Sequence, residues 1–130
     1  MIFDDERTLR TINDAPDDHI IKIFFYLAFH QPQDGIRGFQ VDKKQLQFDL
    51  KLGRTNFLVA LRWLKENVLV NEIKQVETSD FMVNPYIVMN NGDRDARIAE
   101  WNRRCDLDRE KDIRNRKRRR REQSKKQNQQ

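Results

Sequence analysis

The chain has 130 residues, of which 36% are charged and 37% hydrophobic, so it suits one small domain with a charged extension. Its single cysteine, Cys105, excludes an intrachain disulfide. The longest apolar stretch, residues 20–29, is interrupted by Lys22 and is too short to cross a bilayer. The acidic N-terminus is also unlike a signal peptide. We therefore expect a cytoplasmic protein that makes no membrane contact.

The charge of the chain is divided unevenly along its length. Residues 1–102 hold 13 basic and 16 acidic residues, a net charge of −3. Residues 103–130 hold 13 basic and 5 acidic residues, a net charge of +8, and the two parts sum to the +5 of the whole chain. This asymmetry is typical of a basic arm on a folded domain. It predicts a polyanionic partner, which is DNA, RNA or an anionic surface.

The N-terminal third contains one clear helix. Residues 1–13 are polar and acidic, and we expect them to form a loosely docked arm. Asp14 and Pro16 are suited to the cap and first turn of the helix that follows, and Pro32 ends it. Apolar residues recur on one face of this helix, at Ile20, Ile23, Phe24 and Leu27.

Two further helices are predicted after a loop with two glycines at residues 33–38. Residues 39–41 alternate in polarity like a short strand, and Asp42 can cap a helix over residues 43–51. A tight turn around Leu52 and Gly53 leads into a third helix over residues 54–67. Its buried face is predicted to hold Phe57, Ala60, Leu61 and Leu64.

The hydrophobic period then changes from that of a helix to that of a strand. Residues 68–76 read as a strand, residues 77–80 as a polar turn and residues 81–84 as the returning strand, which Pro85 ends. A hairpin with a four-residue tip is therefore predicted. A short apolar segment, residues 86–89, and a turn at residues 90–93 follow.

A fourth helix is predicted after Asp93, which can cap it. Ile98, Trp101 and Cys105 lie on one face of this helix, and beyond Leu107 the apolar pattern thins out. From Arg114 onward we expect the helix to fray into disorder. The predicted organisation is an arm over residues 1–13, a domain over residues 14–105, and a charged tail, helical and then disordered, over residues 106–130.

The order helix, short strand, helix, helix and hairpin predicts an α+β fold of the winged helix-turn-helix type. In such units the N-terminus of the second helix of the pair enters the major groove of DNA. Here that position holds Arg54, Thr55 and Asn56. Arginine suits the edge of guanine, asparagine suits the edge of adenine, and threonine can bond to bases or to phosphate. Predicted phosphate contacts are Lys43, Lys44, Arg62, Lys65, Lys74, Arg116, Lys117, Arg118, Arg119, Arg120 and Arg121.

Other functions remain open at this point. An amphipathic helix with polar residues outside is often only a solvated helix, and Leu58, Val59 and Phe48 would give a protein-interaction module an apolar surface. An enzyme is not expected, because His19 and His30 form no cluster with other ligands. No metal and no cofactor are predicted.

Three segments together resemble the RepL-type plasmid replication initiators of bacteria. They are residues 60–67 (Ala-Leu-Arg-Trp-Leu-Lys-Glu-Asn), residues 81–89 (Phe-Met-Val-Asn-Pro-Tyr-Ile-Val-Met) and residues 91–93 (Asn-Gly-Asp). The resemblance covers about residues 15–100, and its more specific part is the stretch from Asn84-Pro85 to Gly92-Asp93. Two features depart from the family pattern, namely the short region before Asp14 and the arginine-rich tail.

The resemblance implies recognition of a replication origin and recruitment of host replication proteins, with no enzymatic activity. A transcriptional regulator with the same fold is the alternative, since both kinds of protein bind double-stranded DNA in the same way. The sequence leaves open the DNA site and whether the protein acts as a homodimer. It also leaves open whether the tail binds DNA, binds RNA or only aids solubility.

Overall fold

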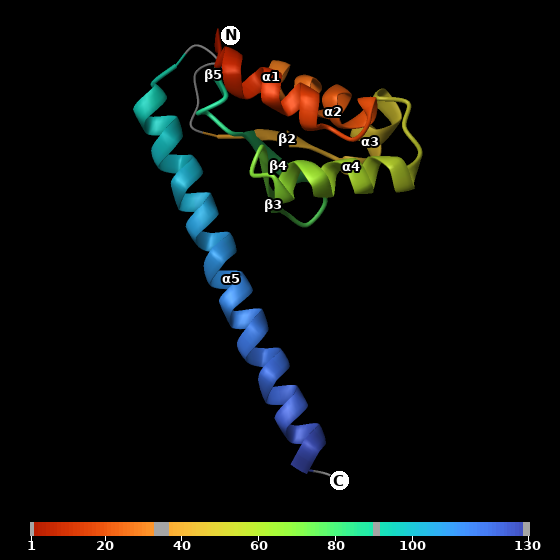
Figure 1. Cartoon of the computed structure of the whole chain (residues 1–130), viewed down its shortest axis with the longest axis vertical. Helices are drawn as coiled ribbons and strands as arrows, with labels where there is room; N and C mark the ends of the chain where they lie inside the picture. The colour runs from red at the N-terminus through yellow and green to blue at the C-terminus, as the bar shows by residue number, and fades with distance from the viewer. Residues whose placement is uncertain (1, 33–36, 90–91, 129–130) are drawn as a thin grey trace.

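The computed structural model describes residues 2–32, 37–89 and 92–128, and this part of the chain has an α+β architecture (Figure 1). Its five helices are α1 Asp5–Asp14, α2 Asp18–Phe29, α3 Lys43–Asp49, α4 Arg54–Glu66 and α5 Arg94–Asn128. Its strands are β1 Ile2–Phe3, β2 Phe39–Val41, β3 Val70–Lys74, β4 Ser79–Val83 and β5 Val88–Met89.

A three-stranded antiparallel sheet in the order β2-β4-β3 forms the centre of the molecule. Side chains of a strand alternate between the two faces of its sheet. Phe81 and Val83 of β4 belong to the hydrophobic core on the face that α2, α3 and α4 cover. Asp80 and Met82 point to the opposite face. All five residues of β4 are buried, because helices cover this strand on both faces.

The core lies between the sheet and the helices α2, α3 and α4. It confirms the predicted buried faces, since one cluster of buried side chains contains Ile20, Ile23, Phe24, Leu27, Leu46, Phe57, Ala60, Leu61, Leu64 and Phe81. Burying a side chain of this size contributes about 1.5–3 kcal/mol. These contacts fix the orientation of α4, and its opposite face is left exposed to solvent.

The N-terminal segment is not the loosely docked arm that the sequence predicts. β1 pairs with β5, and the Phe3 ring lies 5.8 Å from the Phe25 ring. Asp4 caps α1. Asp17, instead of Asp14, caps α2, and its carboxylate accepts hydrogen bonds from the amides of His19 and Ile20. The prediction was wrong because the anchoring contact of Phe3 is made with a distant helix, and local composition gives no sign of it.

The two helices α3 and α4 end in the same way. The residue after each cap, Lys51 and Val68, has a positive φ, of 56° and 59°. The amides of Leu52 and Leu69 then donate to the carbonyls five residues back, those of Gln47 and Leu64. Each helix end thereby has one of its free carbonyl groups hydrogen-bonded. The predicted turn therefore depends on Lys51, and Gly53 serves as the N-cap of α4 without a side-chain bond.

The hairpin is shifted relative to its prediction. Residues 77–80 were expected to form its tip, yet Ser79 and Asp80 are buried within β4, and the turn precedes them. They enter the strand because each finds a charged or polar partner across the fold, Glu72 for Ser79 and Arg104 for Asp80. The turn was therefore predicted two residues too far along the chain, because Ser79 and Asp80 are polar in sequence but buried in the strand.

The predicted glycine loop and the turn at residues 90–93 lie partly outside the described residues. Gly38, at the end of the loop, is buried so closely against Asp80 and the Phe81 carbonyl that any Cβ would overlap them. Asp93 caps α5 as predicted, because its carboxylate accepts bonds from the amides of Asp95 and Ala96.

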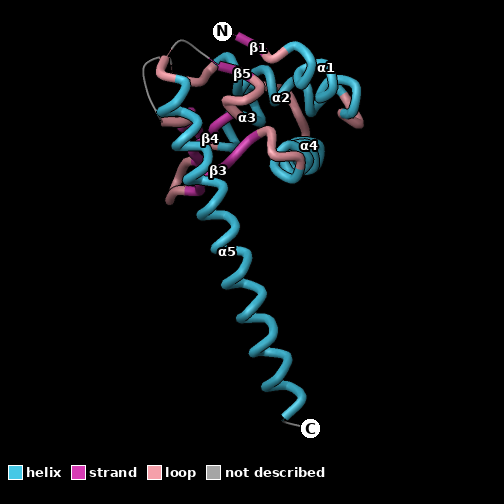
Figure 2. The backbone as a smooth tube through the Cα atoms, turned by 60° about the vertical axis from the view of Figure 1, so that its left-hand side comes forward, coloured by secondary structure: helices cyan, strands magenta, loops and turns pink. Residues whose placement is uncertain are grey.

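Helix α5 continues without a break to Asn128, so the predicted disorder from Arg114 onward is wrong over the described residues. Its first half packs on the face of the sheet opposite α2 and α4, and its second half leaves the body entirely (Figure 2). Arginine and lysine are good helix formers. Three carboxylates, at residues 110, 112 and 122, also lie four positions from a basic residue, which favours the helix.

Candidate nucleic-acid interface

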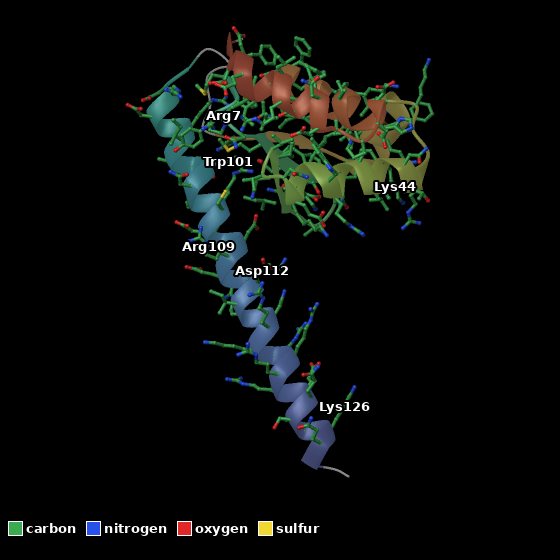
Figure 3. The ribbon with its side chains drawn as sticks, in the orientation of Figure 1. Arg7, Lys44, Trp101, Arg109, Asp112 and Lys126 are labelled. Atoms are coloured by element: carbon green, nitrogen blue, oxygen red, sulfur yellow. The ribbon has the colours of Figure 1, made fainter. Side chains whose placement is uncertain are left out.

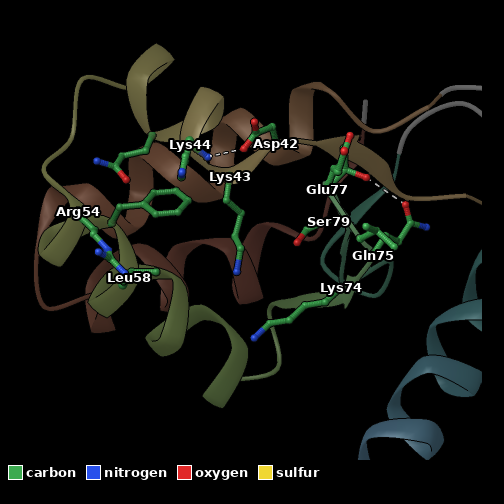
Figure 4. Close-up of a pocket in the computed structure, with 13 residues that line it drawn as sticks. Asp42, Lys43, Lys44, Arg54, Leu58, Lys74, Gln75, Glu77 and Ser79 are labelled. Atoms are coloured by element: carbon green, nitrogen blue, oxygen red, sulfur yellow. Dashed lines mark hydrogen bonds between the residues drawn. The ribbon is translucent and has the colours of Figure 1, made fainter.

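A cleft separates the start of α3 and α4 from the β3–β4 hairpin (Figure 4). It is lined by Asp42, Lys43, Lys44, Gln47, Arg54, Phe57, Leu58 and residues 74–79. Four of the predicted contact residues meet here: Lys43, Lys44, Arg54 and Lys74. Figure 4 shows Lys43 and Lys74 extending from opposite sides into this space. The lining has four basic and two acidic side chains, so it favours an anion.

The exposed face of α4 borders this cleft. Arg54, Thr55 and Asn56 are exposed in the first turn, as predicted, and Arg62 is exposed further along. Leu58 and Val59 lie on the same helix and are 40% and 56% exposed. The helix thus presents polar side chains at its N-terminus and an apolar stripe beside them.

Glu72 of β3 is the feature of this region that sequence reasoning missed. Its carboxylate forms ion pairs of 2.9 Å with both Lys43 and Lys65, and it accepts a bond of 2.5 Å from the Ser79 hydroxyl. The side chain is only 1% exposed. Burial raises the pKa of Glu72, but the bonds from Ser79, Lys65 and Lys43 outweigh it and lower the pKa to about 2.

The predicted phosphate contacts Lys43 and Lys65 are therefore already paired. Their side chains remain 32% and 38% exposed, so each ammonium is held in place at the surface beside the cleft. Lys44, Arg54 and Lys74 take part in no ion pair among the described residues. The sequence does contain one indication that Glu72 has a buried partner, because it is an acidic residue between apolar positions of a predicted strand.

A second polar network fixes α5 to the sheet. Arg104 is 3% exposed and pairs with Asp80 at 2.7 Å and with Glu100 at 3.1 Å. The Asn71 amide donates to Asp108 at 2.7 Å, and Arg97, also buried, donates to the Pro32 carbonyl. These contacts determine the direction in which α5 leaves the body.

Beyond this network the basic side chains of the tail are exposed. Arg109, Asp112 and Lys126 project into solvent from α5, whereas Trp101 lies against the body and is 3% exposed (Figure 3). The predicted tail contacts, residues 116–121, are all exposed on this helix. These residues are distant in sequence from the cleft. Within the described residues, no contact joins them to the basic side chains of the cleft.

The net charge of the body is also divided between its segments. Residues 1–41 hold 4 basic and 7 acidic residues, a net charge of −3. Residues 42–77, which form the helix pair and the hairpin tip, hold 7 basic and 5 acidic residues, a net charge of +2. The negative charge of the body therefore lies largely away from the cleft.

The described residues contain no group of three or more metal-ligating side chains. The His30 ring stacks on Tyr26 with centroids 4.1 Å apart, and its Nδ1 bonds to the Tyr26 carbonyl. Burial raises the pKa of the Cys105 thiol, helped by Asp108, which makes it a poor nucleophile at neutral pH.

Compared with protein-family models, with curated proteins and with solved structures, the chain has no significant match. Among the helices described, none combines the length and the apolarity that crossing a membrane requires.

Proposed function

We propose that this chain binds double-stranded DNA sequence-specifically as a winged helix-turn-helix protein. The turn between α3 and α4 joins the helix pair, α4 enters the major groove, and the β3–β4 hairpin is the wing. The observation that carries this proposal is the exposure of Arg54, Thr55 and Asn56 at the start of α4, beside a basic cleft. The first turn of such a helix is where base edges are read.

The surrounding charges support the same proposal. Lys43, Lys44 and Lys74 flank the cleft and are suited to phosphates on either side of the groove, and Arg62 extends this line along α4. Phosphate contacts of this kind position a protein on the duplex without reading its sequence. Glu72 holds Lys43 and one further lysine, Lys65, at fixed points beside the cleft.

The proposed DNA is a plasmid replication origin, and this part rests on the resemblance to RepL-type initiators. The most specific segment of that resemblance has a structural role in this fold. The Asn84 amide donates to the Val68 carbonyl at 2.9 Å, and its Oδ1 accepts from the Tyr86 amide at 2.9 Å. The residue thereby ties the end of α4 to the segment after β4. Host replication proteins are the partners that an initiator would recruit.

The base-reading role of α4 is tested by titrating Arg54→Ala and Asn56→Ala with cognate and random duplexes at fixed salt. Loss of one bidentate base contact costs about 1–3 kcal/mol at the cognate site only. Asn102→Ala, an exposed asparagine on the docked half of α5, is the matched control and should bind like the wild type. Equal losses on both duplexes would contradict base reading by α4.

The role in replication is tested genetically. The gene, supplied alone, should support a small replicon that lacks its own initiator and carries the cognate repeats. The Arg54→Ala variant should fail to do so at the same protein level. If binding in vitro is specific and no replicon is supported, the transcriptional regulator is the better assignment.

One observation favours a protein-interaction module instead. Phe48 of α3 is 77% exposed, and Leu58 and Val59 are exposed on α4. A variant with both Leu58→Asp and Val59→Asp separates the two functions, because these residues border the proposed groove-facing surface. If that variant is folded and binds cognate DNA as tightly as the wild type, α4 does not enter the groove.

A further inference from the structure

The free half of α5 is held in a fixed direction relative to α4. Its docked half is anchored by Trp101, by the Arg104–Asp80 ion pair and by the Asn71–Asp108 bond. Because α5 is one continuous helix, these anchors also orient residues 109–128. Figures 1 and 2 agree that this half passes β3 and extends beyond the side of the body that carries α4 and the hairpin.

The exposed face of α4 points to the same side. α4 buries Phe57, Leu61 and Leu64 in the core that it shares with α2, so its opposite face, with Thr55 and Arg62, points away from α2. In Figure 1 that is the direction in which α5 continues. The body and the free half of α5 therefore form two arms of an angle, and α4 and the hairpin lie on its inner side.

The charge of the free half suits a polyanion. Residues 109–128 hold 11 basic and 3 acidic residues, a net charge of +8. Six consecutive basic residues, at 116–121, cover all faces of the helix, and none forms an ion pair within the described part of the chain. A membrane surface is a poorer match, because this segment has one large apolar side chain, Ile113, and an interfacial helix needs an apolar face.

The length of the free half sets its reach. Twenty helical residues extend about 30 Å, at 1.5 Å per residue. Since base pairs are spaced 3.4 Å apart along a duplex, this corresponds to about 9 base pairs. A rigid helix of that length reaches DNA outside the segment that α4 and the hairpin cover.

We propose that residues 109–128 form a second DNA-binding element, a rigid basic helix that contacts phosphates on one flank of the site held by α4. This inference rests on the proposed function and adds the location of the contact. Since the helix leaves the body on one side only, each bound protomer protects a flank of about 9 base pairs on that side. The flank contact carries no base specificity, because it is made to phosphates.

The test is a hydroxyl-radical footprint of the full chain on a long duplex with the cognate site at its centre. The wild type is expected to protect the central site and one flank. A variant in which all six residues of 116–121 are replaced by Gln should protect the centre alone. For this variant, the slope of log affinity against log salt concentration should be shallower by about 3 or more. Each phosphate contact contributes about −0.9 to that slope. Glutamine keeps the helix propensity, and circular dichroism checks that the helix is retained.

Ile113→Pro tests the rigid direction at constant charge. Proline breaks a helix, and position 113 lies beyond the last anchor of α5. This variant should keep most of the salt slope and lose the one-sided flank protection. Ile113→Ala, which preserves the helix, is the matched control and should protect the same flank as the wild type.

The outcomes separate the two proposals. Protection of the centre without a protected flank in the wild type would overturn this inference and leave the proposed function standing. Absence of specific central protection would overturn the proposed function. A flank protected equally by Ile113→Pro would show a flexible arm in place of a rigid helix. Release of the flank by a structured RNA, at concentrations at which random duplex DNA leaves it protected and with the centre still bound, would assign the helix to RNA.

Discussion

Replacing Glu72 by Gln should destabilise the fold in a pH-dependent way. The pKa of Glu72 is lowered from 4.5 to about 2, because bonds from Ser79, Lys65 and Lys43 outweigh the effect of burial. A change of one in pKa corresponds to about 1.36 kcal/mol, so lowering the pKa by about 2.5 gives an upper limit of about 3.4 kcal/mol. Both lysines are about one-third exposed, and solvent screening reduces this figure to roughly 2–3 kcal/mol.

The sign of the pH dependence follows from the lowered pKa. The stabilising contribution of Glu72 is fully present above pH 4.5 and is lost as the pH falls toward 2, where the folded protein also takes up the proton. Glu72→Gln should therefore lower the free energy of unfolding most at pH 7. The difference from the wild type should shrink steadily between pH 5 and pH 2.

Urea denaturation of the wild type and the variant at several pH values measures this difference. Glu110→Gln, an exposed glutamate on the free half of α5, is the matched control and should change stability little at any pH. A difference for Glu72→Gln that does not vary with pH would refute the electrostatic explanation. A difference below about 0.5 kcal/mol at pH 7 would show that the two ion pairs add nothing.

Four further substitutions, one of them a control, test the packing of the fold by thermal or urea unfolding. Leu61→Ala should cost about 2–5 kcal/mol, whereas the neighbouring Arg62→Ala should change stability little, and equal effects would contradict the assigned face of α4. Val68→Gly should stabilise the protein by about 1 kcal/mol, because valine at a φ of 59° is strained; a loss of stability would contradict that strain. Asp80→Asn should cost about 3–5 kcal/mol by leaving the buried Arg104 of α5 without its charged partner on β4, and a neutral effect would show that Glu100 alone suffices.

The helical core was predictable because its information is local. The apolar period in α2 and α4 identified buried faces that the structure confirms, and Asp42 and Asp93 were correctly predicted as caps. The strand Phe39–Val41 was also correct. Each of these predictions depends on residues within a turn or two of one another, where the helix and strand periods act.

The errors occurred where a residue's state depends on a distant partner. Ser79 and Asp80 are polar and turn-like by local criteria, but Glu72 and Arg104 satisfy them inside the sheet. Phe3 orders the N-terminal segment through Phe25 in the same way. Local composition carries no record of such pairings.

The candidate site was predicted in part for the same reason. The exposure of Arg54, Thr55 and Asn56 follows from the helical period and was correct. The ion pairs of Lys43 and Lys65 with Glu72 were missed, because the packing of α3 and α4 against β3 brings these residues together.

The division of charge within the molecule gives it a strong electric dipole. Residues 1–41 carry −3, and their helices α1 and α2 lie on the side of the body opposite the free half of α5, which carries +8. In the field of a polyanion such a molecule is turned during its approach, so most encounters begin with the basic helix foremost. Under the proposed DNA binding, the acidic side would face outward from a bound duplex and repel a second one. This polarity would favour coating a single duplex over cross-linking two.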